Sequence, residues 1–490
     1  MIKNALKIVI RSVGLNPTTV ANTFRSSWLG IALNSWRISK LVKNNQARNH
    51  FIYELIKEFN PDLTSSKPAG TLRIGLLWDR RDRFKWLGYA NDDKNCEIVR
   101  MRIAMFKPIW WHYLRDYLKD TVAEQNMGEY PLDTYFKAEY DKGKAVYHQY
   151  CKDVVSFIKE TYNIDVFLLP KLNDDWAIEI VRAFRAAGVP LVIDDREGAN
   201  TKKRLEIVPP RLRQLFDEGI DFDLLCAHNT AHKELFMKSG FDPDKIIING
   251  APESDYWSNP HLWPALKDID PRLQSDKILV LIFAFGPRNF LHFYYGNEKR
   301  DWTQLGEDYH EVILQLLEKY GDRIQIAYKL GGQTARDRFN GYEAFAKKVA
   351  PYEESGAFVE LRGSVNSFDL LVNADVTIGF QTSGLTEAMF LDKPIICGGW
   401  GDLYNEIKDT LLPFHTTKAL TFVDSKERMW EVLDLLLENL DTFTLTDEMG
   451  AARKEFRESF FYNPDGNVSR RLLGYVKEVA TGQLPRSTIP

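Results

Sequence analysis

Three features are missing from this 490-residue chain, and each absence excludes a class of function. No run of about 20 apolar residues occurs, so we expect no membrane-spanning helix. The apolar stretch at residues 5–13 is interrupted by Lys7 and Arg11, which argues against a cleavable signal. Positive charge is not in surplus, because 64 Lys and Arg residues stand against 68 Asp and Glu, so no nucleic-acid binding is expected. The sequence predicts a soluble, cytoplasmic protein.

Cysteine is also scarce, which excludes two kinds of structural framework. The four cysteines have neither CxxC nor CxxxC spacing, so the sequence predicts no disulfide framework and no zinc site. Cys226 and Cys397 lie inside apolar runs, where a thiol behaves as a small hydrophobic side chain. We expect buried, reduced thiols, as in a reducing, cytosol-facing compartment.

The first 63 residues differ from the rest in charge and predict a basic helical arm. All charged residues before Glu54 are positive: Lys3, Lys7, Arg11, Arg25, Arg37, Lys40, Lys43 and Arg48. Apolar residues from Ile2 to Val13 recur at helical spacing. Residues 1–50 therefore either lie on an anionic membrane surface, which makes the protein peripheral to the membrane, or pack on the body as a helical pair with a solvated basic face.

Beyond a polar linker at residues 64–70, short apolar runs alternate with helical segments in two successive series. Such runs are typical of parallel sheets covered on both faces by helices. The sequence predicts an α/β fold with two doubly wound, Rossmann-like domains facing a cleft, where ligands bind beyond the carboxyl ends of the strands. The predicted domains are residues 70–255 and 277–464, joined by a hinge at 256–276 and followed by a last helix at 465–490. The predicted strands are residues 72–78, 166–169, 191–193, 224–227, 246–248, 278–283, 324–328, 359–361, 376–378, 394–397 and 420–423.

The most informative segment is ADVTIGFQTSGLTEAMFLDKPIICGGW at residues 374–400, in which a predicted strand runs through a small polar turn into a helix. Thr382, Ser383 and Gly384 place free backbone N–H groups at the helix N-terminus, an arrangement that favours phosphate. The missing side chain of Gly384 permits close approach of a ligand. Glu387 either accepts hydrogen bonds from a ribose or closes a capping box with the start of its own helix.

This segment resembles the donor-nucleotide segment of GT-B glycosyltransferases. The resemblance is closest to enzymes of bacterial capsule and surface polysaccharide assembly, to their Kdo-transferase-like and CDP-glycerol-polymerase-like relatives, and to UDP-N-acetylglucosamine 2-epimerases. It implies a metal-independent enzyme without cofactor that moves a sugar, or a sugar or alditol phosphate, from a nucleotide-activated donor to a glycan or lipid-linked acceptor. Residues 465–471, DGNVSRR, resemble the start of a last helix that crosses back onto the first domain.

Three further residues are predicted to contact the donor. Gly286, in FAFGPR after the first strand of the second domain, would let the backbone approach a diphosphate, and Arg288 would clamp it. Lys329 ends the next strand, where relatives often have a basic residue followed by His-Pro. Gly331 and Gly332 replace that pair here.

Candidate bases follow strands of the first domain. An inverting sugar transfer needs a base for the acceptor hydroxyl. Residues 194–198, DDREG, place Glu197 and then Asp195 in that role, and a solvated acidic loop is the alternative. His228 is a third candidate base. His232 lies four residues further on, but without an HExxH glutamate a metal site there is not expected.

Two other functions remain open on the same fold. A 2-epimerase should carry a pair of glutamates at the start of the donor helix, whereas here Glu387 is followed by Ala388. A non-catalytic binding subunit would fit the missing His-Pro after Lys329.

Overall fold

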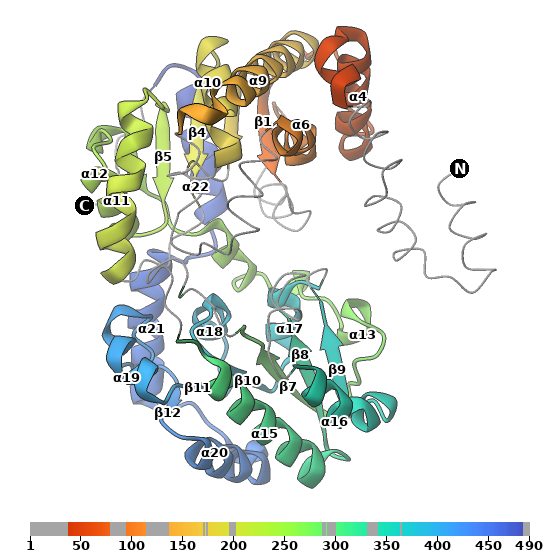
Figure 1. The fold of residues 1–490 in the computed structure, drawn as a ribbon, viewed down its shortest axis with the longest axis vertical. Coiled ribbons are helices and arrows are strands. Elements are labelled where there is room, and N and C mark those ends of the chain that lie inside the picture. The colour runs from red at the N-terminus through yellow and green to blue at the C-terminus, as the bar shows by residue number, and fades with distance from the viewer. Residues whose placement is uncertain are drawn as a thin grey trace, which may run out of the picture.

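The computed structural model shows two α/β lobes placed one above the other (Figure 1). The residues that it describes are 38–78, 95–113, 137–169, 172, 175–195, 202–286, 291, 300–330, 342–362 and 365–483.

The first lobe contains a six-stranded parallel sheet in the order β2-β1-β3-β4-β5-β6. Its strands are β1 (Leu72–Trp78), β2 (Cys96–Arg102), β3 (Val166–Leu169), β4 (Leu191–Asp194), β5 (Leu224–Ala227) and β6 (Ile246–Ile248). The edge strand β2 is the one that the sequence analysis missed. It carries Glu97, Arg100 and Arg102 on its partly exposed positions, so it has no continuous apolar run.

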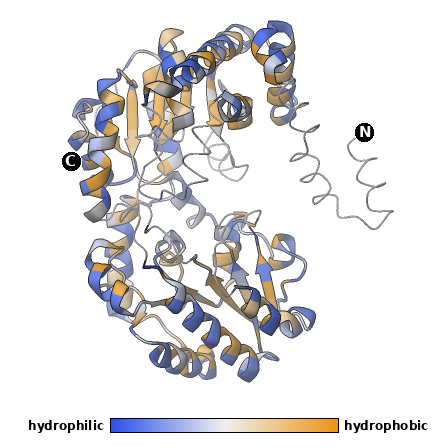
Figure 2. Ribbon diagram, in the orientation of Figure 1, coloured by the Kyte–Doolittle hydropathy of each residue, from blue (hydrophilic) through white to orange (hydrophobic). Residues whose placement is uncertain are grey.

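Helices cover this sheet and also lie beyond one side of it. They are α4 (Asn45–Phe59), α6 (Lys107–Tyr113), α9 (Asp141–Tyr162), α10 (Asp175–Ala186), α11 (Lys202–Asp217) and α12 (Thr230–Lys238), with 3-10 turns η1 (Ile103–Met105), η2 (Ala138–Tyr140) and η3 (Pro243–Lys245). Figure 2 shows the strands as mainly hydrophobic, while the helices carry both kinds of residue.

The described part of the basic arm packs on the first lobe. Ile52 and Ile56 of α4 are buried in the core that contains α9 and β2. Arg48 is 2% exposed and forms an ion pair with Asp153 at 2.9 Å. Residues 38–59 therefore follow the packing alternative, and Arg48 is not a membrane-facing charge. Residues 1–37, which carry most of the predicted membrane contact, lie outside the described residues.

The second lobe contains another six-stranded parallel sheet, in the order β12-β11-β10-β7-β8-β9. The order turns back between β7 and β10, and in doubly wound folds this switch point is where ligands bind. The strands are β7 (Ile278–Phe283), β8 (Ile324–Lys329), β9 (Phe358–Leu361), β10 (Val376–Gly379), β11 (Ile395–Gly398) and β12 (Thr421–Val423).

The linker and the helices of the second lobe complete the chain order. The linker includes η4 (Pro252–Tyr256), η5 (Pro260–Leu262) and α13 (Leu266–Ile269). The remaining helices before the last one are α15 (Thr303–Tyr320), α16 (Tyr342–Glu354), α17 (Ser367–Asn373), α18 (Ser383–Ala388), α19 (Asp402–Ile407), η6 (Lys408–Thr410), α20 (Lys426–Glu438), η7 (Leu440–Thr442) and α21 (Asp447–Phe461). Tyr256 holds the linker to the second lobe, because its hydroxyl donates to Asp369 on α17 at 2.6 Å.

The last helix, α22 (Val468–Ala480), returns to the first lobe (Figure 1). Its buried side chains recur on one helical face and join Val166, Leu168, Val192 and Leu224 in a single apolar cluster. The buried residues that α22 contributes are Leu472, Leu473, Tyr475, Val476 and Val479. One face of the first sheet is thus completed by the end of the chain.

A buried carboxylate fixes the start of α22. The side chain of Asp255 accepts hydrogen bonds from the backbone N–H groups of Val468 at 2.9 Å and Ser469 at 2.7 Å. Close by, Gly250 has a φ of +91°, and a Cβ there would lie 2.8 Å from the carbonyl oxygen of Phe461. The two chain segments that connect the lobes therefore lie against each other.

Burial sets the pH dependence of Asp255. Desolvation raises the pKa of its carboxyl above the usual aspartate value, against the opposing effect of the Ser469 and Val468 amides. A raised folded-state pKa gives a stabilising contribution that is complete below the unfolded pKa and is lost as pH rises through the folded pKa.

We therefore expect the wild type to lose stability relative to Asp255→Asn as pH rises from about 4 toward neutral, since the unfolded carboxyl titrates near that value. The free energy of unfolding, measured in urea across this range, tests the sign. A relative gain in stability with rising pH would mean that the helix amides outweigh desolvation.

Candidate donor and acceptor site

The carboxyl ends of the strands in the two lobes point toward each other. The arrows of β1 and β5 in the upper lobe and of β9 in the lower lobe show this direction (Figure 1). Residues that directly follow these strands are therefore candidates for a shared site.

The predicted donor turn lies between β10 and α18, as a strand followed by a short turn and a helix. Thr382 is the N-cap of α18, and its hydroxyl accepts from the Gly384 N–H at 3.2 Å. Ser383 is exposed, whereas Gly384 is buried and Glu387 is partly exposed. Of the predicted donor residues in this turn, Ser383 thus presents the most surface to a ligand.

Gln381 holds this turn in shape. Its φ of +44° is in the left-handed region, which non-glycine residues rarely adopt. Its side-chain amide donates to the Leu412 carbonyl at 3.2 Å and accepts from the Leu412 N–H at 2.9 Å. Two hydrogen bonds to a neighbouring loop offset the strained backbone, as is common beside functional sites.

Tyr309 of α15 forms hydrogen bonds with the ends of the two strands beside this turn. Its buried hydroxyl lies 3.1 Å from the Gly379 carbonyl and 3.0 Å from the Gly398 carbonyl, and it accepts from the Gly398 N–H at 2.9 Å. Burial raises the pKa of Tyr309, so the hydroxyl keeps the proton that it donates. Sequence analysis missed this residue because a tyrosine inside an amphipathic helix looks like any core aromatic.

Gly384 has a packing role that the sequence analysis did not foresee. A Cβ at this position would lie 2.5 Å from Cζ of Phe283, at the end of β7. The absence of a side chain therefore allows α18 to pack closely on the neighbouring strand. A larger residue at position 384 would therefore disturb the fold, whether or not a ligand approaches there.

The other predicted donor residues lie at the carboxyl ends of β7 and β8. Among the described residues, no atom lies within 4 Å of the position that a Cβ on Gly286 would take, so their packing does not require glycine there. Lys329 is 7% exposed, and its ammonium donates to the Arg362 carbonyl at 3.0 Å and lies 3.5 Å from that of Leu330. Arg288 lies outside the described residues.

In the first lobe, β4 and β5 bring acidic residues and a histidine together. His228 Nε2 lies 3.8 Å from Asp194 Oδ1, and both side chains are buried. Asp195 has no exposed surface and His228 is 4% exposed. His232 Nδ1 accepts from the His228 N–H at 3.2 Å, so His232 helps to fix the backbone at His228. Glu197 lies outside the described residues.

Asp194 is the residue that sequence analysis passed over in this group. It was one of several acidic residues after a strand, and only the pairing of β4 with β5 brings it opposite His228. The pair places a buried carboxylate beside a candidate base.

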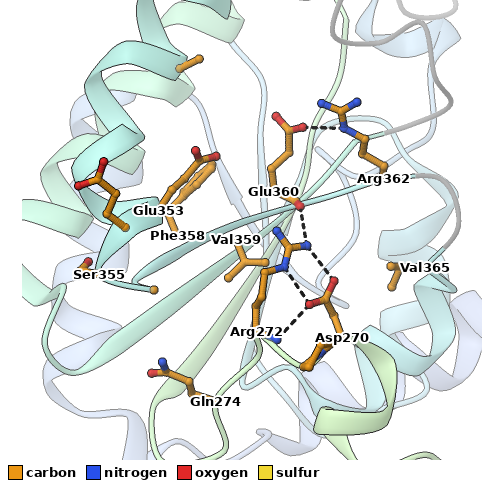
Figure 3. A pocket seen from close by; sticks show the side chains of 14 residues that line it. Asp270, Arg272, Gln274, Glu353, Ser355, Phe358, Val359, Glu360, Arg362 and Val365 are labelled. Atoms are coloured by element: carbon orange, nitrogen blue, oxygen red, sulfur yellow. Dashed lines mark hydrogen bonds and ion pairs between the residues drawn. The ribbon is translucent and has the colours of Figure 1, made fainter. Parts of the chain in front are cut away.

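A separate hollow of about 760 Å³ lies along the edge strand β9 (Figure 3). Arg272 pairs with both carboxylate oxygens of Asp270, at 2.9 and 2.8 Å, and donates to the Glu360 carbonyl at 3.2 Å. This contact covers a backbone acceptor on the edge strand β9, a common protection against edge-to-edge pairing. The hollow lies apart from the donor turn after β10.

Two kinds of feature are absent from the described residues. Within the ranges given above, no three His, Cys, Asp or Glu side chains lie close enough together to hold a metal ion. None of the helices in the described part of the chain is long and apolar enough to cross a membrane.

Comparison with known proteins identifies the fold. A Listeria monocytogenes protein assigned as a UDP-N-acetylglucosamine 2-epimerase superposes with a TM-score of 0.51 at 14% identity, covering 86% of this chain and 100% of its own. The S. aureus protein MnaA, solved with UDP, gives a TM-score of 0.50 at 14% identity with the same coverage. The wall teichoic acid polymerase TagF gives 0.49 at 12% identity, over 94% of this chain and 100% of its own, and adds nothing to the assignment. No family model and no curated protein matches the chain.

Together with two parallel six-stranded sheets, these likenesses show that the chain has the GT-B fold. The predicted fold class of two Rossmann-like domains is confirmed.

The close contact of Gly384 with Phe283 gives a stability test. Gly384→Ala is expected to lower the free energy of unfolding by about 1–3 kcal/mol, the usual cost of overpacking. Phe283→Leu should recover part of the loss, because it removes the atoms that a Cβ would meet. Gly286→Ala is the control and should change stability little, because no described atom lies within 4 Å of the added Cβ. A Gly384→Ala variant as stable as the wild type would contradict the packing role.

Proposed function

We propose that this protein is a glycosyltransferase that moves a sugar, or a sugar or alditol phosphate, from a nucleotide-activated donor to a glycan or lipid-linked acceptor. The observation that carries the proposal is the turn and helix after β10, which occupy the switch point of the second sheet. The His228–Asp194 pair lies at the carboxyl ends of β4 and β5 in the first sheet. A direct displacement needs a leaving-group site and a base on opposite sides of the reacting carbon.

The donor half of the proposal rests on the exposed Ser383 at the start of α18. The donor diphosphate accepts hydrogen bonds from the backbone N–H groups and hydroxyl of this turn, where the helix dipole favours negative charge. Glu387, partly exposed on the same helix, accepts from the ribose hydroxyls. Gly286, Arg288 and Lys329 complete the phosphate contacts.

The acceptor half has two candidate bases. Glu197 remains the first choice from the sequence, as a carboxylate in the acidic segment after β4. His228 is the candidate that Asp194 supports, because the adjacent carboxylate stabilises the imidazolium formed when the ring takes the acceptor proton. Asp195 is less suited to act as the base, since no part of its side chain is exposed.

A 2-epimerase is the second candidate function. The Listeria monocytogenes protein with the same fold is assigned as such an epimerase, although an identity of 14% shows only the shared fold. Ala388 opposes it, because it stands where the resemblance expects the second glutamate of an epimerase.

One assay separates these functions. Purified full-length protein is incubated with a panel of UDP- and CDP-activated sugars and alditols, with and without cellular lipid extract. A transferase releases nucleotide much faster when the extract supplies an acceptor. An epimerase changes the sugar without release of nucleotide and without the extract, and a binding subunit does neither.

Variants of the candidate bases provide the internal controls. Glu197→Gln, Asp195→Asn and His228→Asn each remove basicity with little change in shape. We expect the variant of the true base to lose roughly 10²-fold in turnover with donor affinity unchanged. Acceptor-dependent release that survives in all three variants would contradict a direct displacement assisted by one of these bases.

A further inference from the structure

Helix α21 of the second lobe contacts the first lobe directly beside His228. The Asn229 side chain, which is buried, donates from Nδ2 to the Phe460 carbonyl at 2.8 Å. Phe460 lies in the last turn of α21, where backbone carbonyls have no partner within the helix. The first lobe therefore caps the C-terminal end of this helix.

The same side chain also fixes the segment that carries His228. Asn229 is the N-cap of α12, and its Oδ1 accepts from the His232 N–H at 2.9 Å. His232 in turn accepts from the His228 N–H. One amide group thus joins the backbone around His228 to the end of α21.

A second contact of α21 reaches the end of the donor helix α18. Arg457 donates from Nη1 to the carbonyl of Met389, the C-cap of α18, at 3.2 Å. Arg453 is buried and donates to the carbonyls of Leu391, Lys393 and Ala419. Burial lowers the pKa of Arg453 to about 10, so the guanidinium stays charged at neutral pH.

Arg457 and Phe460 are three residues apart, so they lie on neighbouring positions of one helical turn. Only about 5 Å of rigid helix separates the contact with α18 from the contact with Asn229. This is a short path of hydrogen bonds between the segment that carries His228 and the helix that carries the donor turn.

We propose that the last turn of α21 sets the position of His228 relative to the donor turn, with Asn229 and Arg457 as positioning residues at its two contacts. This inference rests on the proposed transferase function for its effect on turnover. Neither residue needs to touch a substrate. A shift of about 1 Å between reacting groups costs roughly 10²-fold in rate, so a small change at this contact has a large effect.

Asn229→Asp breaks the contact selectively. Aspartate caps a helix as well as asparagine does, so the start of α12 is retained. It has no N–H to donate, and its carboxylate repels the Phe460 carbonyl. Asn44→Asp is the matched control, because Asn44 is the exposed N-cap of α4 and its side chain accepts from the Ala47 N–H of its own helix. Asn229→Ser, which keeps a capping oxygen but is shorter, is the second variant.

Arg457→Gln tests the other contact by removing the guanidinium that reaches Met389. Lys454→Gln is its matched control on the same helix, since Lys454 is largely exposed and loses the same charge. Each variant is compared with its control at temperatures equally far below their own midpoints of thermal unfolding.

The first measurement is an interdomain distance and needs no activity. Spin labels are placed by Met237→Cys on α12 and Leu435→Cys on α20, whose native side chains are 44% and 68% exposed. All four native cysteines are buried, which favours labelling at the introduced sites. We expect the distance distribution to shift or broaden in Asn229→Asp, Asn229→Ser and Arg457→Gln, and to stay unchanged in both controls.

The second measurement separates binding from turnover. We expect donor affinity within about twofold of wild type and a loss of tenfold or more in turnover for the positioning variants, because the donor turn itself is intact. An unchanged distance distribution in Asn229→Asp and Asn229→Ser overturns the positioning role, whatever the turnover. A changed distribution in a protein without transferase activity supports the positioning role and rejects the proposed function instead.

Discussion

The return of α22 to the first lobe is the constraint on which the two-lobed structure depends. Leu472 and Val476 are fully buried against the first sheet, and burial of such side chains contributes about 1.5–3 kcal/mol each. The helix can occupy this place only if the chain crosses back beside the linker. There the Asp255 carboxylate accepts hydrogen bonds from the first two N–H groups of α22. Stability of the first lobe and its placement against the second are therefore coupled.

The donor turn depends on packing that a ligand would never touch. Tyr309 ties the ends of β10 and β11 together, Gln381 holds a left-handed backbone, and Gly384 allows α18 to approach Phe283. These contacts leave Ser383 exposed on a turn whose backbone is fixed before any ligand arrives. A preorganised set of N–H groups binds an anion without the cost of ordering a loop.

The sequence predicted the sheets well because buried parallel strands leave a direct signal. The eleven predicted strands all appear, whereas β2 was missed because its charged residues interrupt the apolar pattern of an edge strand. Helix α11 contains Pro209 and Pro210, which usually end a helix, yet Val208, Leu212 and Leu215 are buried, so tertiary packing maintains it. Sequence patterns therefore predict a buried strand well, and they predict an edge strand or a proline-containing helix less well, because packing against other elements determines these.

The candidate site was predicted less completely, because most of its geometry comes from distant parts of the chain. The turn at Thr382–Ser383 was found from its local strand-turn-helix pattern. The contacts of Tyr309, of Asp194 with His228, and of Asn229 with Phe460 join residues on different elements, and a single sequence carries no signal for them. Glu197 and Arg288 stay predictions, since they lie outside the described residues.

The central claim is that a nucleotide-activated donor binds at the start of α18. A crystal structure of the full chain with UDP, and a second with CDP, tests it most directly. The account predicts diphosphate oxygens about 3 Å from the backbone N–H and hydroxyl of Ser383, with the ribose at Glu387. A nucleotide bound elsewhere, such as in the hollow beside β9, or no binding of either nucleotide, would contradict it.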